Sequence, residues 1–527
     1  MPIILRCTIG ATAIALLFSA AQPAFSEEPK RGGTLTLGVK SVLPTLDCHA
    51  LGSPTNVVNV APMYSTLLRF DPDNYPKIVG DIAVSWTMSE DRQVYTFRLH
   101  PNVKFHDGSP LTSADVKASY ERIANPPAGV TSRRKGQLAA VQSMETPDPL
   151  TLVVKLSRPD PAILIAFASP YGCIYSAKKL AENPKYPETA PMGSGPFKFV
   201  DYVPGSSASY ARFDDYFVKG LPYLDAVKTI FVPGAAHVNA IAGGQVDGTL
   251  SQMTPSGIDE IKAVKGNSIV FPVSPFNVTN MVDINTTKPP LNDVRVRRAL
   301  NLALDRRVGE AMVRVATNQK GIGILFARDV NQGLTDAEIA KLPGFNPEVE
   351  ANRAEARKLL SEAGVKDLTL TLLNLNSGEP YTTLGVFVVD QMRKIGVKVN
   401  TRLVDAGGYY SGLAGLNFDL AIDANVTVSS DPTEVLTKFL PDDGQNYTGA
   451  KDPVLLDLYA RQSQESDPEK RRQLVKEFER RVVDQAYLLP MFRSELYAAL
   501  ANYVKGWKIL PSQSLNQDLR QVWLDKK

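Results

Sequence analysis

The C-terminal half of the chain alternates between two hydrophobic periodicities. Segments with apolar residues at helical spacing take turns with short runs that are apolar throughout or at every second position. The helical segments are 352–364, 382–396 and 407–416, and the strand-like runs are 367–375, 397–405 and 418–426. Gly364 and Gly396 end the first two helical segments, a common place for glycine. This order predicts an α/β fold with a parallel or mixed sheet covered by helices.

In such sheets, ligands bind beyond the carboxyl ends of the strands. Those ends lie at 374–381, 404–410 and 424–431. Acidic and amide side chains there suit a hydroxyl-rich or cationic solute, and tyrosines can stack on it or donate hydrogen bonds. The alternative is that Glu379 lies on a solvated loop and that Asp423 caps a local turn. The candidate ligand-binding residues of this half are Glu379, Tyr381, Tyr409, Tyr410, Asp423 and Asn425.

His106 and Asp107 stand side by side in the N-terminal half and look like half of a catalytic or metal site. Local structure accounts for them. Residues 94–105 predict two strands joined by a turn, and the Asp-Gly pair that follows predicts another turn. Thr112 and Asp115 have the spacing of a capping box at the start of a helix. We therefore expect this segment to shape the chain rather than to act on a substrate.

The first 26 residues have the features of a cleavable signal peptide. One basic residue, Arg6, precedes a short apolar stretch, and small residues lead to a cleavage site before Glu27. The alternative, a membrane anchor, needs about 20 apolar residues, and this stretch is shorter. Cys7 precedes the apolar stretch, so it is not placed for lipid attachment after it. We expect an exported protein without a lipid anchor.

Composition is that of an ordinary soluble protein. The 527 residues suggest two to four domains, and the net charge of +3, without a long basic run, argues against nucleic acid as a partner. Cys48 and Cys173 remain after export, and an oxidising compartment would let them form one disulfide. Their separation in the sequence leaves that pairing open.

Motifs for enzymes and cofactors are missing from the sequence. There is no Gly-x-Ser-x-Gly elbow, phosphate loop or His-Glu-x-x-His segment. Ser194 stands between glycines, but no pattern nearby supplies a base. Asp47, Cys48 and His49 are adjacent, so their side chains point apart and are poor ligands for one metal ion. We predict no catalytic residues, no bound metal and no cofactor.

Several long motifs resemble one known family. They include "DIAVSWTMSEDRQVYTFRLHPNVKFHDGSPLTSADVKASYERI" at 81–123, "MGSGPFKF" at 192–199, "AIAGGQVDG" at 240–248 and "DINTTKPPLNDVRVRRALNLALDR" at 283–306. "LPTLDCHA" departs from the family's Leu-Asp-Pro motif, with Cys48 in place of proline. These motifs resemble extracellular solute-binding proteins, family 5, which serve peptide- and nickel-type ABC importers.

The resemblance implies a bilobed periplasmic-binding-protein fold, type II-like, with mixed sheets, flanking helices and a ligand cleft between the lobes. It implies a discontinuous first lobe, 27–60 with 190–276 and 488–527, an inserted region, 61–189, and a second lobe, 277–487. It also implies a periplasmic, monomeric protein that delivers a small-molecule or short-peptide ligand to ABC permease subunits at the inner membrane.

The resemblance also bears on the ligand. Val428 stands where peptide-binding relatives often carry the acid that holds the ligand's ammonium group, and Glu379 stands where dipeptide-binding relatives carry a base. An unpaired buried charge is costly, so an ordinary dipeptide is a poor fit. An oligopeptide held by its backbone, a chelated metal, and a sensor or chaperone role stay open. On the first lobe, the candidate ligand-binding residues are Thr45, Leu46, Gln252 and Met253.

Overall fold

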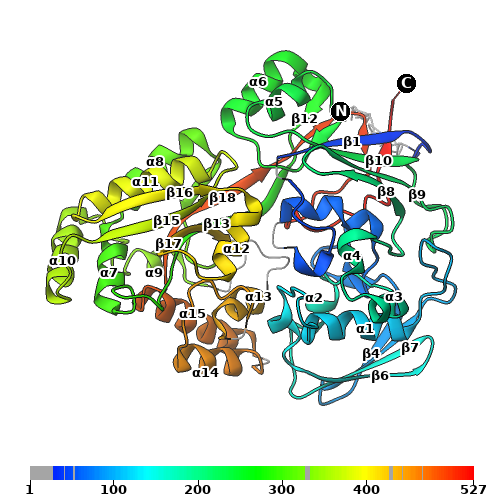
Figure 1. Cartoon of the computed structure of the whole chain (residues 1–527), viewed down its shortest axis with the longest axis horizontal. Helices are drawn as coiled ribbons and strands as arrows, with labels where there is room; N and C mark the ends of the chain where they lie inside the picture. Colours follow the sequence, from blue (N-terminus) through cyan, green and yellow to red (C-terminus); the bar gives the residue numbers. More distant parts are fainter. Residues whose placement is uncertain are drawn as a thin grey trace, which may run out of the picture.

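The computed structural model describes residues 28–526 except 41, 52–53, 327–332, 426–430, 442 and 466. The signal peptide expected at 1–26 and Val428 lie outside the described residues. Two large sheets and one smaller sheet carry the fold (Figure 1). Within the described part of the chain, no helix is long and apolar enough to cross a membrane.

The C-terminal half forms a six-stranded mixed sheet, as the periodicity predicts. Its order is β14 (Gln319–Ile322), β18 (Leu488–Tyr497), β13 (Val273–Ile284), β17 (Leu420–Asn425), β15 (Thr369–Leu375) and β16 (Lys398–Val404). β15 runs parallel to β16 and β17, and β13 is antiparallel to β17 and β18. We call the part built on this sheet the second lobe.

Helices surround this sheet (Figure 1). They are α7 (Val294–Ala303), α8 (Arg306–Ala316), α10 (Val349–Glu362), α11 (Tyr381–Arg393) and α12 (Ala406–Ala414), with α14 (Pro453–Gln462) and α15 (Pro468–Asp484) farther on. Gly364 and Gly396 follow α10 and α11 at φ 71° and 84°, a conformation that costs glycine little. The predicted strand and helix order is confirmed. The apolar faces of α10 and α11 pack with the strands into one core, and that of α12 packs into a second, smaller cluster.

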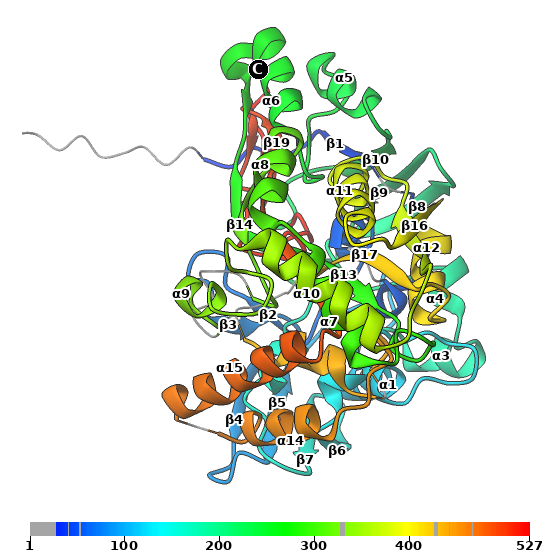
Figure 2. The same cartoon turned by 90° about the vertical axis from the view of Figure 1, so that its left-hand side faces the viewer.

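A seven-stranded sheet forms the first lobe. Its order is β12 (Ile269–Val270), β19 (Ala499–Ala501), β11 (Gly248–Thr249), β1 (Thr34–Val39), β10 (Ala226–Phe231), β9 (Ser207–Arg212) and β8 (Phe197–Val203). Segments from the beginning, middle and end of the chain therefore meet in one sheet. α5 (Ala236–Ala242) and α6 (Pro255–Lys265) belong to this lobe and lie far from α14 and α15 (Figure 2).

The chain crosses between the two sheets at two neighbouring places. Residues 271–272 join β12 to β13, and Ala498 joins β18 to β19. The backbone N–H of Ala498 donates to the carbonyl oxygen of Pro272 at 3.0 Å. The two crossings are therefore hydrogen-bonded to each other.

The segment between β1 and β8 adds a four-stranded antiparallel sheet and α1 (Ser113–Ala124). The order is β4 (Ala83–Met88), β5 (Val94–Leu99), β7 (Thr151–Leu156) and β6 (Val141–Asp148). The capping box is present: the Thr112 N–H donates to Asp115 Oδ2 at 2.7 Å. The second strand predicted within 94–105 is only an isolated bridge, Lys104 with Pro110, because the turn at 107–108 reverses the chain at once.

The contacts of His106 are with the backbone and an aromatic ring of the fold. Its Nε2 lies 3.0 Å from the Gly195 carbonyl oxygen, and its ring meets Phe213 edge to face. Burial lowers its pKa to about 4. The Asp107 carboxylate accepts from the backbone and hydroxyl of Ser109 in the turn. His106 therefore anchors this segment to the first lobe, and Asp107 stabilises the turn that follows.

Candidate functional site

A cavity of about 150 Å³ lies between the two lobes. That is room for about ten waters or a small organic solute. Its wall on the second lobe includes the carboxyl ends of β15 and β17, where the sheet topology predicts a ligand. The opposite wall comes from residues after β1 and β11, from the inserted segment, and from residues 513–514 near the C-terminus.

Five of the ten predicted site residues line this cavity: Gln252, Glu379, Tyr381, Tyr410 and Asp423. The alternative for Glu379 was a place on a solvated loop, and its carboxylate is in fact engaged locally. Its carboxylate accepts from the Thr383 hydroxyl at 2.9 Å and from the Thr383 N–H at 3.3 Å, in the first turn of α11. Its ligand role stays a prediction.

Three predicted residues lie behind the cavity wall. Asn425 accepts a hydrogen bond at 2.9 Å from the ammonium group of Lys438, which does line the cavity. The hydroxyl of Tyr409 bonds to the Ile422 carbonyl and lies 3.2 Å from Asp423 Oδ1. Met253 is fully buried in the first-lobe core. These side chains can support residues that face the cavity.

Thr45 and Leu46 line a second, wider cleft of about 970 Å³. This cleft and the cavity share Lys40, Leu375 and Ser377, so the two spaces adjoin. The wider cleft is bordered mainly by apolar and small residues of both lobes, with Lys40, Glu188 and Asp405 among them. It offers a way in from the surface.

Two cationic side chains on the first-lobe side of the cavity were missed by sequence reasoning. Lys40 Nζ donates to the Gln252 carbonyl oxygen at 2.5 Å, and burial lowers its pKa from 10.5 to about 8. Arg134 is buried, which lowers its pKa, and its Nη1 donates to the Leu51 carbonyl oxygen at 2.8 Å. Among the described residues, no carboxylate makes an ion pair with either cation within 4.0 Å, although the charge of Glu434, which also lines the cavity, partly offsets the lowering of the Arg134 pKa. The sequence could have indicated Lys40, because this residue directly follows β1, at the carboxyl end of that strand.

The second-lobe wall contains a pair of buried carboxyl groups. Asp423 on β17 faces the cavity, and Asp283 on β13 is its diagonal neighbour on the same sheet face. Burial raises the pKa of both groups, and the charge of Asp423 raises that of Asp283 further. Asp283 therefore holds its proton more tightly, and Asp423 is the group that presents an acceptor to the cavity.

The C-terminal segment contributes Gln513 and Ser514 to the cavity wall. Gln513 is only 9% exposed, and its Oε1 has no hydrogen-bond partner in the described part of the chain. A buried amide oxygen without a partner is costly, and a solute that donates to it removes that cost. Nothing in the sequence indicated that Gln513 would lie here with an unpartnered oxygen.

The disulfide left open by the sequence is formed between Cys48 and Cys173, with Cα atoms 6.2 Å apart. The residues beside Cys48 are engaged locally. Asp47 pairs with Arg122 at 2.6 Å, and His49 Nε2 lies 3.0 Å from the Cys173 carbonyl oxygen. Within the described ranges, no three or more His, Cys, Asp or Glu side chains cluster as metal ligands.

Comparisons with known proteins agree with this architecture. Residues 77–447 match the sequence profile of bacterial extracellular solute-binding proteins, family 5. The chain is 26% identical to a probable di/tripeptide-binding protein 5 of Pseudomonas aeruginosa, over 93% of this chain and 95% of that protein. It is 28% identical to the glutathione-binding protein GsiB of Pectobacterium atrosepticum, over 70% of this chain and 69% of that protein.

A solved structure extends the comparison to the whole fold. The periplasmic binding protein AgaA of Agrobacterium tumefaciens R10, in complex with agropinic acid, superposes with a TM-score of 0.84 at 26% identity, over 94% of this chain and 99% of AgaA. The predicted α/β fold class and family resemblance are confirmed. The matched family and these relatives are named as binding proteins, and related proteins serve ABC importers. The chain therefore belongs to family 5 of the bacterial extracellular solute-binding proteins, the substrate-binding components of ABC importers.

Proposed function

We propose that this protein captures a small organic solute that carries a carboxylate, and that the solute is not an ordinary dipeptide. The observation that supports this ligand class is the pair Lys40 and Arg134. Both cations line the cavity, and no described carboxylate forms an ion pair with them. A buried cation is stabilised by a counter-charge, which a bound carboxylate supplies.

Two hydrogen-bond acceptors give the rest of the ligand's chemistry. Asp423 accepts from the second-lobe wall, and Gln513 offers an unpartnered amide oxygen on the same wall as the two cations. A solute that carries a carboxylate and also hydroxyl or amine donors matches both walls. Glu379 stands where dipeptide-binding relatives carry a base, so the carboxylate of a dipeptide in the usual orientation would meet an acid. The agropinic acid bound by AgaA makes that compound a suitable first acid to test.

We further propose where and how the protein works. The signal peptide at 1–26 would be removed on export, leaving a periplasmic, monomeric protein without a lipid anchor. The disulfide fits an oxidising compartment. The predicted boundaries of the two lobes and the inserted region belong to this proposal. The lobes would close on the solute and present it to permease subunits, with no chemical reaction and no nucleic acid partner.

A thermal-shift comparison tests the ligand class. Mature protein, unfolded and refolded to remove co-purified ligand, is mixed with agropinic acid, glutathione or Ala-Ala, each as the free acid and as a methyl ester. Ligand at about 100 times its dissociation constant adds about 2.7 kcal/mol to the free energy of unfolding. We expect agropinic acid or glutathione to raise the melting temperature more than Ala-Ala, and the acids to exceed their esters.

Variants assign the effect to the cavity. Arg134→Met and Lys40→Met should each reduce the shift by the acid, whereas Lys135→Met removes an exposed charge beside Arg134 and should not. If Ala-Ala stabilises the protein most, or if esters equal acids, the proposal is wrong. A stronger shift by long peptides or by chelated nickel would favour the oligopeptide or metal-chelate alternative.

A further inference from the structure

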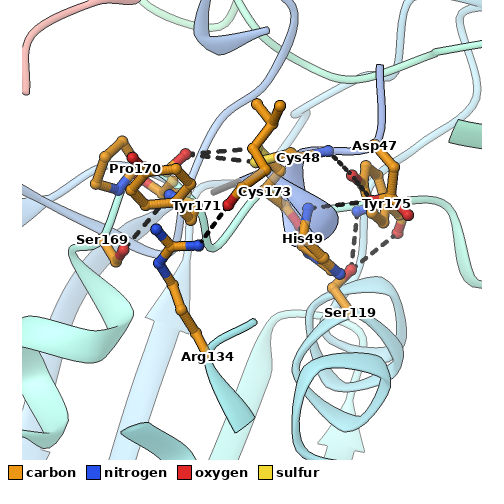
Figure 3. The surroundings of a disulfide bond; sticks show 12 residues. Asp47, Cys48, His49, Ser119, Arg134, Ser169, Pro170, Tyr171, Cys173 and Tyr175 are labelled. Atoms are coloured by element: carbon orange, nitrogen blue, oxygen red, sulfur yellow. Dashed lines mark hydrogen bonds between the residues drawn. A yellow bond between two sulfur atoms is a disulfide. The ribbon is translucent and has the colours of Figure 1, made fainter. Parts of the chain in front are cut away.

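The disulfide lies between two groups of side chains (Figure 3). On one side are Asp47, His49 and Tyr175, next to α1. On the other side is Arg134, which faces the cavity. The bond joins two short segments that are 125 residues apart in the sequence, and both sulfur atoms are buried.

Arg134 touches both of the segments that the disulfide joins. Its Nη1 donates to the carbonyl oxygen of Leu51, three residues after Cys48, at 2.8 Å. Its guanidinium carbon lies 3.2 Å from the centre of the Tyr171 ring, two residues before Cys173. The guanidinium therefore rests on one group from each side of the covalent link.

Short local bonds connect these contacts to the two cysteines. The Leu51 N–H donates to the Cys48 carbonyl oxygen at 3.3 Å, and the Gly172 N–H donates to the Ser169 carbonyl oxygen at 2.9 Å. The sulfur atoms of Cys48 and Cys173 lie 3.4 and 3.6 Å from the Pro170 carbonyl oxygen. Neither contact group can move far while the disulfide is closed.

We propose that the Cys48–Cys173 disulfide is a positioning device for Arg134, and that it sets the affinity for the solute's carboxylate. This inference rests on the proposed function, in which Arg134 holds that carboxylate. A guanidinium pairs with a carboxylate through two parallel hydrogen bonds, so its affinity depends on orientation. If the Arg134 guanidinium is held in place before the solute binds, the entropy cost of ordering it no longer weakens the affinity.

The two segments have other connections, so we expect the protein to fold without the bond. The Tyr175 hydroxyl accepts from the Cys48 N–H and donates to Asp47 Oδ1, both at 2.9 Å. These contacts lie on the α1 side of the disulfide (Figure 3). Loss of the bond should therefore loosen the Arg134 side first.

The test uses the double variant Cys48→Ala/Cys173→Ala of the whole mature protein. Calorimetry measures the affinity for agropinic acid and glutathione, each as acid and methyl ester. We expect the preference for acid over ester to fall at least tenfold, towards that of Arg134→Met with the disulfide intact. General loosening would weaken acid and ester equally. A crystal structure of the double variant should show the guanidinium displaced from Leu51 and Tyr171.

The outcomes separate this inference from the proposed function. If Arg134→Met removes the acid preference and the double variant keeps it, the disulfide proposal is wrong and the ligand class stands. If Arg134→Met changes nothing, or if neither acid binds the wild type, the proposed ligand class fails. In every case, an unmoved guanidinium in the double-variant crystal overturns the positioning role.

Discussion

Arg122 on α1 donates to the Asp47 carboxylate through Nη2 at 2.6 Å, and the two side chains are only 3% and 1% exposed. This ion pair ties the inserted segment to the loop that carries Cys48. Removing one partner leaves the other charge buried without compensation, which typically costs about 3–5 kcal/mol. We expect Arg122→Met to lower the free energy of unfolding by about that amount in urea titrations.

Lys117→Met on the same helix is the matched control. Lys117 pairs with Glu121 at the surface, so its loss should cost less than about 1 kcal/mol. Equal effects of the two substitutions would contradict the assigned role of the buried pair.

His49 makes the same region sensitive to acid. Its Nδ1 lies 3.0 Å from Arg122 Nη1, which can only donate, so Nδ1 accepts and the imidazole is neutral. Burial lowers the pKa of His49 to about 4. Because the unfolded chain binds this proton below about pH 6.5, the free energy of unfolding should fall between pH 6.5 and 4, by about 2 kcal/mol at pH 5.

Urea titrations at pH 7.5, 6 and 5 measure this effect. His106 and His237 have pKa values lowered to about 4 in the same way and add to the total slope. His49→Gln should show a shallower dependence than the wild type. A wild-type stability that stays constant from pH 7.5 to 5 would rule the mechanism out.

The ammonium group of Lys40 should make solute binding depend on pH above about pH 8. Its pKa of about 8 means that the ammonium group loses its proton above that pH. The affinity for an acid solute should then fall by up to about tenfold per pH unit. Calorimetry with agropinic acid at pH 7, 8 and 9 should show the fall in the wild type. The Lys40→Met variant should bind agropinic acid more weakly at pH 7, and its affinity should not change between pH 7 and 9. If the affinities of the variant and the wild type fall with pH in parallel, Lys40 does not have this role.

Arg133 reaches from the inserted segment to the second lobe. Its Nη1 donates to the Tyr447 hydroxyl at 3.4 Å, and its guanidinium lies 5.3 Å from the centre of the Tyr410 ring. Such contacts contribute about 0.5–1 kcal/mol at exposed sites. Arg133→Ala should speed solute dissociation about threefold in stopped-flow traces and leave association nearly unchanged. Lys135→Ala is the control and should leave both rates unchanged. If Arg133→Ala changes only the association rate, Arg133 does not hold the lobes together.

Much of the second lobe could be predicted from the sequence, because its signals are local. Helical and strand periodicities and glycines after helices do not depend on distant residues, and they gave the order of elements that the sheet shows. The capping box at Thr112 was predictable for the same reason. The strand expected after residue 101 failed because a nearby turn left too few residues to pair.

The first-lobe wall of the cavity was harder to predict. Lys40, Arg134 and Gln513 come from three distant parts of the chain and meet only after the lobes form. The carboxyl-end rule, applied to β1 as well, would have indicated Lys40. Arg134 directly precedes a short helical turn, Lys135–Leu138, and its sequence surroundings resemble those of any solvated basic loop. Whether Cys48 and Cys173 pair was undetermined because separation along the chain does not give distance in space.

The hydrogen bond between Ala498 and Pro272 has a consequence for how the lobes move. Two independent linkers would let the lobes rotate, twist and slide. Here the linkers lie side by side and are bonded to each other, so twisting or sliding would break that bond, whereas bending of both linkers together would not. We therefore expect the relative motion of the lobes to be mainly a rotation at this pair of linkers, which would return the walls of the cavity to the same register at each closure.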